Sequence, residues 1–118
     1  MFKIVDVASF KWPVKVNIPR DGGKFTPATF TAEFVALPQD EIDQALEDAR
    51  GGALDEGFAH RVLCGWPAGQ VQDADGSELA YSDEAKDKLL RMSYVRNGVV
   101  EAFFDGVSGG ARRKNLSR

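Results

Sequence analysis

The residues best suited to chemistry in this chain are His60 and Cys64, which lie four positions apart. On a helix over about 54–64 their side chains would share one face, as a cysteine nucleophile and its histidine base require. No third residue orients the pair, and Cys64 directly follows apolar Val62 and Leu63. One His and one Cys also fall short of the roughly four ligands of a zinc site. We therefore expect a non-enzymatic protein with a buried thiol, a surface imidazole and no catalytic, metal or cofactor residues.

Carboxylates gather around Gly76, where Asp73, Asp75 and Glu78 suggest a calcium-binding loop. An EF-hand loop has glycine at its sixth position and a carboxylate at its first. Counting back from Gly76 places apolar Val71 at the first position, so the register fails. The spacing instead predicts a reverse turn rich in aspartate.

The composition is that of an ordinary globular protein, with 43% hydrophobic and 28% charged residues among 118. We expect one domain over 1–107, followed by a flexible basic tail at 108–118. A formal net charge of -3 argues against nucleic acid as the main partner. A single cysteine forms no internal disulfide, and no apolar run approaches the roughly 20 residues of a membrane span. These features predict a soluble cytoplasmic protein that binds neither nucleic acid nor membrane.

A β-hairpin is predicted over roughly 12–37. Apolar and polar residues alternate from Val14 to Ile18, which is the period of a half-buried strand. Asp21-Gly22-Gly23 follows and supplies glycines for the positive φ angles of a turn. The alternation then resumes, and its apolar face carries Ala28, Phe30, Ala32, Phe34 and Ala36.

Three to four helices are expected to pack against this hairpin, which gives an α+β fold. The first helix opens with Leu37-Pro38-Gln39-Asp40-Glu41, with proline at an early position, and the second covers about 54–64. Ser82 caps the third, and the helix is expected to pause near 96–98 before a second apolar run. The third helix is expected to bury Ala85, Leu89 and Met92. The hairpin residues Phe30 and Phe34 are expected to meet Ile42, Leu46, Leu89, and either Val99 or Phe103.

Aromatic residues outside the hairpin allow two interpretations each. Trp66, between Gly65 and Pro67, either fills the core with its indole N–H bonded to a backbone carbonyl or serves as a binding hot spot. Phe103 and Phe104 are adjacent on a helix, so one is expected to enter the core. The other is either covered by the hairpin or exposed to a partner.

The order of these motifs resembles that of tail assembly chaperones from long-tailed phages and prophages. The resemblance covers roughly 12–107 and is carried by several short segments. These are Phe30-Thr31-Ala32-Glu33-Phe34 before Leu37-Pro38, Gly65-Trp66, Val71 through Leu79 with Asp73-Ala74-Asp75-Gly76, Tyr81-Ser82-Asp83-Glu84, Leu89-Leu90, Val95-Arg96, and Val99-Val100-Glu101-Ala102-Phe103-Phe104.

This resemblance implies a protein without catalytic activity. Such chaperones bind the long, helical tape measure protein, keep it soluble, help recruit tail tube subunits around it, and are absent from the finished virion. For the partner surface we favour the C-terminal helix together with the segment from Trp66 to Tyr81. The candidate binding residues are Trp66, Tyr81, Val99, Val100, Phe103 and Phe104.

Other functions remain open on the sequence alone. The main alternative is a minor tail or neck component that is retained in the virion. Two further alternatives rank below it. One is a small hydrolase using Cys64 and His60, and the other is a nucleic-acid-binding regulator using the basic tail. An exposed hairpin edge would also allow a second copy of the chain to pair, so homo-oligomerisation is a further expectation.

Overall fold

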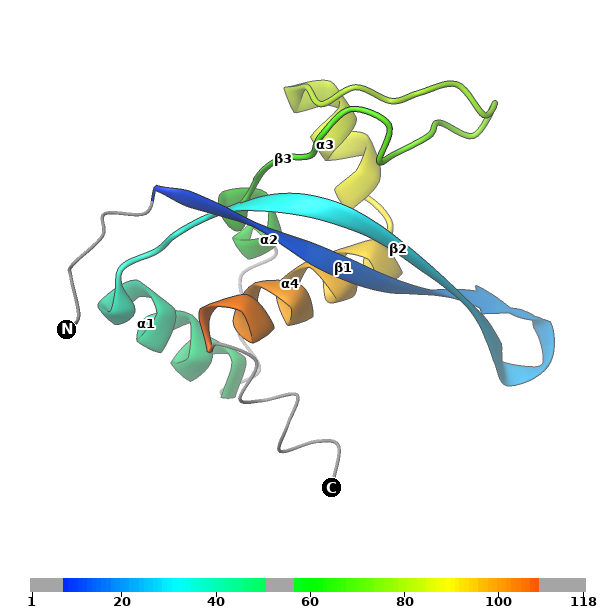
Figure 1. Ribbon diagram of the computed structural model, residues 1–118. Coiled ribbons are helices and arrows are strands. Elements are labelled where there is room, and N and C mark those ends of the chain that lie inside the picture. Colours follow the sequence, from blue (N-terminus) through cyan, green and yellow to red (C-terminus); the bar gives the residue numbers. More distant parts are fainter. Residues whose placement is uncertain (1–7, 51–56, 109–118) are drawn as a thin grey trace, which may run out of the picture.

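The computed structural model describes residues 8–50 and 57–108. Its elements follow the order of Figure 1. They are β1 (Ser9–Arg20), a short 3-10 turn (Asp21–Gly23), β2 (Lys24–Val35), α1 (Gln39–Arg50), α2 (Phe58–Val62), β3 (Leu63–Gly65), α3 (Asp83–Leu90) and α4 (Ser93–Val107). The fold is α+β, as predicted, with the hairpin packed against helices. The predicted basic tail falls outside the described residues, apart from Ser108.

The predicted hairpin is confirmed, and it extends a little further at its start. β1 and β2 pair antiparallel without interruption from Ser9 opposite Val35 to Arg20 opposite Lys24. Gly22 and Gly23 make the turn with φ angles of 77° and 75°, which glycine adopts without steric cost. The strands form a long twisted ribbon whose tip projects beyond the helices (Figure 1).

The helix expected over 54–64 is corrected by the structure. Within the described part of that range, α2 ends at Val62, and Leu63–Gly65 form β3 instead. β3 pairs antiparallel with β2 at Glu33 and Phe34, which gives a three-stranded sheet in the order β1-β2-β3. The backbone of Leu63–Gly65 therefore pairs with the open edge of β2, which it could not do if α2 continued through these residues. Leu63 is fully buried in this position.

A lysine from another helix fixes the end of α2. The ammonium group of Lys86 on α3 donates hydrogen bonds to the carbonyl oxygens of His60 and Leu63, at 2.6 and 2.9 Å. The last carbonyls of a helix have no partner within the helix, and a cation there also complements the helix dipole. Lys86 thus ties α3 to the junction between α2 and β3.

α4 runs unbroken from Ser93 to Val107, so the expected pause near 96–98 is wrong. The interruption lies earlier, where α3 ends at Leu90 and Met92 takes the N-cap position of α4. α4 crosses beneath β1 (Figure 1) and packs against it more extensively than against any other described element. Gly98 permits this contact because a side chain there would meet the β1 backbone.

An aromatic cluster occupies the centre of the core. The ring of Phe34 lies 5.9 Å from that of Phe103, which confirms the expected contact between hairpin and terminal helix. Phe58 packs edge-on against Phe103 and stacks on Phe104, with ring centroids 5.6 Å apart in both pairs. Phe103 and Phe104 are therefore both buried, and neither is left exposed.

Two expected core residues are instead at the surface. Leu46 is 39% exposed, because the face of α1 that turns toward the core is centred between Ile42 and Ala45, and Leu46 lies about 70° from that centre, at the edge of the buried face. Met92 is 38% exposed, because α3 ends before it and the buried residues of that helix are Ala85 and Leu90. Among the described helices, none combines the length and apolar character needed to cross a bilayer.

Candidate functional site

His60 and Cys64 do not share a helix face, because His60 lies on α2 and Cys64 on β3. Nδ1 of His60 lies 3.4 Å from a carboxylate oxygen of Asp87 on α3. Burial, followed by the negative charge of Glu33, raises the pKa of the Cys64 thiol. A raised pKa is the opposite of what a nucleophilic cysteine requires. Across residues 8–50 and 57–108, no three His, Cys, Asp or Glu side chains gather as a metal site would need.

The aspartate-rich segment forms the predicted reverse turn. The amide of Gly76 donates to the carbonyl oxygen of Asp73 at 2.9 Å, and the φ angle of Gly76 is 87°. Asp75 accepts hydrogen bonds from the amide and hydroxyl of Ser77, and these bonds lower the pKa of the Asp75 carboxyl. Both oxygens of Asp73 accept from the ammonium of Lys88, at 2.7 and 2.8 Å. This bond lowers the pKa of Asp73 and attaches the turn to α3.

Trp66 lies at the base of this turn, and its side chain is part of the core. Its side chain is buried, and the indole N–H donates to the carbonyl oxygen of Leu79 at 2.9 Å. The ring of Tyr81 packs edge-on against the indole, with centroids 5.0 Å apart. The interpretation of Trp66 as a core residue bonded to a backbone carbonyl is therefore confirmed.

The six candidate binding residues do not form one exposed surface. Val99 and Phe103 are fully buried, and Phe104 and Trp66 are nearly so. Tyr81 and Val100 are half-buried at the edges of the core. The four buried residues pack inside the domain, so binding of a partner through them stays a prediction.

A groove that sequence reasoning missed lies between the outer half of the hairpin, the aspartate turn and the junction of α3 with α4. It consists of two adjoining hollows of about 580 and 250 Å3. We call it the Met92 groove and define it by the residues that line both hollows, which are Ile18, Gln72, Leu89, Met92 and Tyr94. Four of these five side chains are largely apolar or aromatic, and Met92 is one of three large hydrophobic residues that are exposed among those described.

Charged groups line one end of the Met92 groove. Asp73, Lys88 and Arg91 line the larger hollow. Lys88 is already paired with Asp73 at 2.7 Å, whereas exposed Arg91 makes no ion pair with any residue in the described ranges. The groove therefore combines an apolar floor with an excess of positive charge at its rim.

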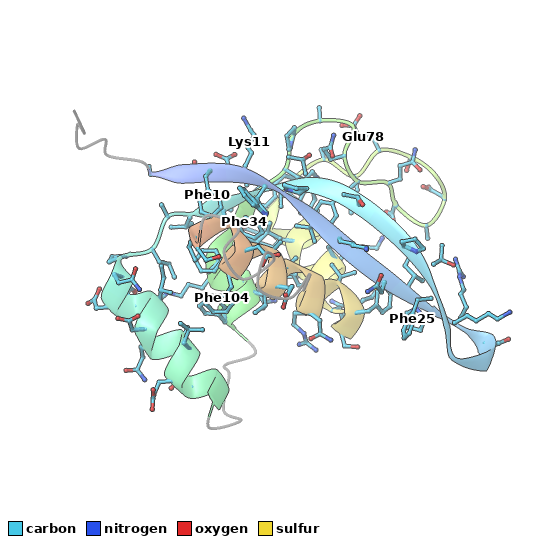
Figure 2. All side chains as sticks on the ribbon, turned by 60° about the horizontal axis from the view of Figure 1, so that its bottom comes forward. Phe10, Lys11, Phe25, Phe34, Glu78 and Phe104 are labelled. Atoms are coloured by element: carbon cyan, nitrogen blue, oxygen red, sulfur yellow. The ribbon has the colours of Figure 1, made fainter. Side chains whose placement is uncertain are left out.

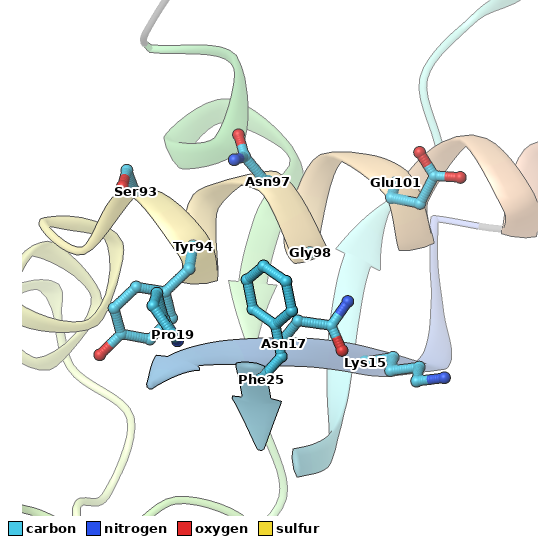
Figure 3. Close-up of a pocket in the computed structure, with 9 residues that line it drawn as sticks. All are labelled: Lys15, Asn17, Pro19, Phe25, Ser93, Tyr94, Asn97, Gly98 and Glu101. Atoms are coloured by element: carbon cyan, nitrogen blue, oxygen red, sulfur yellow. The ribbon is translucent and has the colours of Figure 1, made fainter. Parts of the chain in front are cut away.

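A third hollow, of about 470 Å3, lies between β1 and α4 and has a mixed polar and apolar lining (Figure 3). Lys15, Asn17, Asn97 and Glu101 contribute to its wall. Phe25, which is 62% exposed, also borders it from the hairpin, away from the aromatic cluster that contains Phe10, Phe34 and Phe104 (Figure 2). This mixed lining offers fewer apolar contacts than the Met92 groove.

The Met92 groove was missed because its residues come from three separate parts of the chain. Ile18 continued the hairpin alternation, and Leu89 and Met92 fitted a helical stripe, so each was assigned to the core. The one sequence signal was Met92 itself, at the junction of two helices. Comparison of the chain with models of protein families, with curated proteins and with solved structures finds no match.

Proposed function

We propose that this protein is a tail assembly chaperone of a long-tailed phage or prophage. It acts without catalysis in the cytoplasm of the bacterial host and is absent from the finished virion. Its client is the tape measure protein, which it keeps soluble while tail tube subunits are recruited. The family resemblance of the motifs between Phe30 and Phe104 motivates this proposal.

The Met92 groove is the observation that supports the proposal best. A tape measure protein is a long helical chain whose apolar stripes aggregate when nothing covers them. The groove presents Ile18, Leu89 and Met92 as an apolar strip that such a stripe would cover. Met92 is well suited to this role, because methionine side chains adapt their shape to varied apolar partners.

The overall charge of the chain is consistent with a solubilising role. The formal net charge is -3, and much of the negative charge lies on α1, where Asp40, Asp43 and Glu47 are exposed. α1 is a separate element from those that form the Met92 groove. A client bound in the groove would therefore leave this acidic surface in contact with water, and net charge opposes aggregation.

The decisive experiment is co-expression with the long, coiled-coil-rich protein encoded just downstream of this chain. We expect the soluble fraction of the large protein to rise and the two proteins to co-purify. A Met92→Asp variant of this chain should lose this effect, whereas Leu46→Asp, at an equally exposed leucine on α1, should retain it.

Two results would count against the proposal. If the large protein aggregates equally with and without this chain, the chaperone function fails. If mass spectrometry of purified particles detects this chain in amounts comparable to known tail proteins, it is a minor tail or neck component instead.

A further inference from the structure

We infer that the Met92 groove binds a single amphipathic helix, and that Arg91 selects a helix with carboxylates along one flank of its apolar stripe. This inference rests on the proposed function in taking a helix of the client as the occupant. It adds the position of the binding site and the charge pattern that the client must carry.

The apolar part of the site is formed by residues that the fold leaves partly uncovered. Ile18, Leu89 and Tyr94 are half-buried, and Met92 between the two helices is 38% exposed. The floor is continuous, because Ile18, Leu89, Met92 and Tyr94 each border both hollows. An apolar stripe with a repeat of three to four residues presents side chains on one face, which suits such a floor.

The charge at the rim determines which helices fit. Of the three charged residues that line the larger hollow, Asp73 and Lys88 neutralise each other. Arg91 is left as a positive group on a domain whose formal net charge is -3. A guanidinium pairs with a carboxylate through two parallel hydrogen bonds, which favours a glutamate or aspartate beside the stripe.

Tyr94 supplies a second polar contact for the occupant. Its hydroxyl donates to the sulfur of Met92 at 3.0 Å, and a thioether is a weak acceptor. A carboxylate or carbonyl oxygen on the occupant would accept this hydrogen bond more strongly. Exchanging the partner of Tyr94 would also release Met92 to pack against the apolar stripe.

Addition of a strand to the β1 edge of the sheet is a less suitable mode of binding. The outer edge of β1 contains Pro13 and Pro19, which lack N–H donors, and exposed Lys11 and Lys15. Proline and lysine are the residues that protect sheet edges from further pairing. The Met92 groove is lined largely by apolar side chains, with Lys88 already paired to Asp73, so a helix in the groove is the favoured mode.

The test uses the full chain and two synthetic helical peptides as probes. Both peptides carry a leucine stripe over about three heptads, flanked on one side by glutamates in the first and by lysines in the second. We expect fluorescence anisotropy to show about fivefold to tenfold tighter binding of the glutamate peptide. Arg91→Glu should reverse this preference, and Met92→Asp should weaken binding of both peptides by about tenfold or more.

Leu46→Asp is the matched control, because Leu46 and Met92 are 39% and 38% exposed on different elements. Circular dichroism should show that all three variants remain folded. Equal binding of the two peptides, with no effect of Arg91→Glu, would overturn the selection by charge. Equal losses from Leu46→Asp and Met92→Asp would overturn the assignment to the groove.

The co-expression assay separates this inference from the proposed function. If the wild-type chain solubilises the large protein and Met92→Asp does so equally well, the groove is not the binding site, although the chaperone function stands. If the wild-type chain leaves the large protein insoluble while it still distinguishes the two peptides, the chaperone function fails and the groove assignment stands.

Discussion

Gly98 on α4 lies directly against the backbone of β1 at Lys15. A Cβ atom built on Gly98 would stand 2.6 Å from the carbonyl oxygen of Lys15, which is closer than real Cβ contacts. Two turns further along α4, a Cβ on Gly106 would meet the ring of Phe10. The terminal helix therefore docks on the hairpin through glycines, which let the two backbones approach closely.

Replacing Gly98 by alanine should destabilise the domain, although alanine is the better helix former. In an exposed helix the change would stabilise by roughly 0.5–1 kcal/mol. Here the neighbouring atom belongs to the backbone and cannot rotate away, and overpacking costs about 1–3 kcal/mol. We expect a net loss of about 1–2 kcal/mol in the free energy of unfolding, measured in urea. Asn97→Ala, at the exposed neighbouring position, is the control and should be neutral or stabilising.

The two tryptophans should respond differently to replacement by phenylalanine. The indole N–H of Trp66 donates to the carbonyl of Leu79, whereas that of Trp12 is buried and finds no acceptor within the described residues. Both substitutions remove the same atoms, so their difference reports the hydrogen bond together with the deeper burial of Trp66 compared with half-buried Trp12. We expect Trp66→Phe to cost about 1 kcal/mol more than Trp12→Phe in urea unfolding. Equal costs would contradict the expected contribution of the bond to Leu79.

The parts of the fold that depend on local sequence were predicted correctly. The hairpin follows from alternation with a period of two and from the turn at Gly22-Gly23, and Ser82 caps α3 through the amide of Ala85 at 3.0 Å. The environment of Trp66 was also predicted, because a buried indole N–H needs an acceptor.

Features that depend on contacts between distant segments were missed. β3 exists because Leu63 and Gly65 lie beside the free edge of β2, and their local sequence reads as a helix end. From the sequence alone, Gly98 indicates a break in the helix, whereas its contact with the Lys15 backbone explains why glycine is needed there. The Met92 groove joins three segments and therefore has no local signature.

The hydrogen bond between Lys88 and Asp73 should make the aspartate turn sensitive to acid. The pKa of Asp73 is lowered below 3.8, chiefly by this bond, so protonation in the folded state requires a lower pH than in the unfolded state. The stabilisation is therefore complete above about pH 5, begins to fall near the ordinary value of 3.8, and is lost as the pH falls through the folded-state pKa. Lys88→Gln should raise the pKa of Asp73 toward its ordinary value, as measured by carboxyl NMR.

Asp75 provides an internal control for that titration. Its pKa is lowered mainly by hydrogen bonds from Ser77, with Lys88 as the smallest contribution. In Lys88→Gln the pKa of Asp75 should therefore stay low while that of Asp73 rises. If the two carboxyls shift together, the turn itself has rearranged, and the direct bond from Lys88 is not the cause.

Cys64 should react slowly with alkylating reagents, because its thiol has a pKa above the ordinary 9.0. Iodoacetamide attacks the thiolate, and burial together with the charge of Glu33 disfavours that form. Glu33→Gln removes the repulsion, so it should lower the pKa and accelerate alkylation at neutral pH. Because the chain has one cysteine, mass spectrometry follows this reaction without ambiguity.

His60 distinguishes this structural thiol from a catalytic one. It lies on a different element from Cys64 and is not among the groups that shift the pKa of the thiol. His60→Gln should therefore leave the rate of alkylation unchanged, whereas unfolding in guanidinium should raise it to that of a free cysteine. Slower alkylation in His60→Gln would mean that the imidazole promotes formation of the thiolate. That result would favour a small hydrolase using Cys64 and His60 over a binding protein.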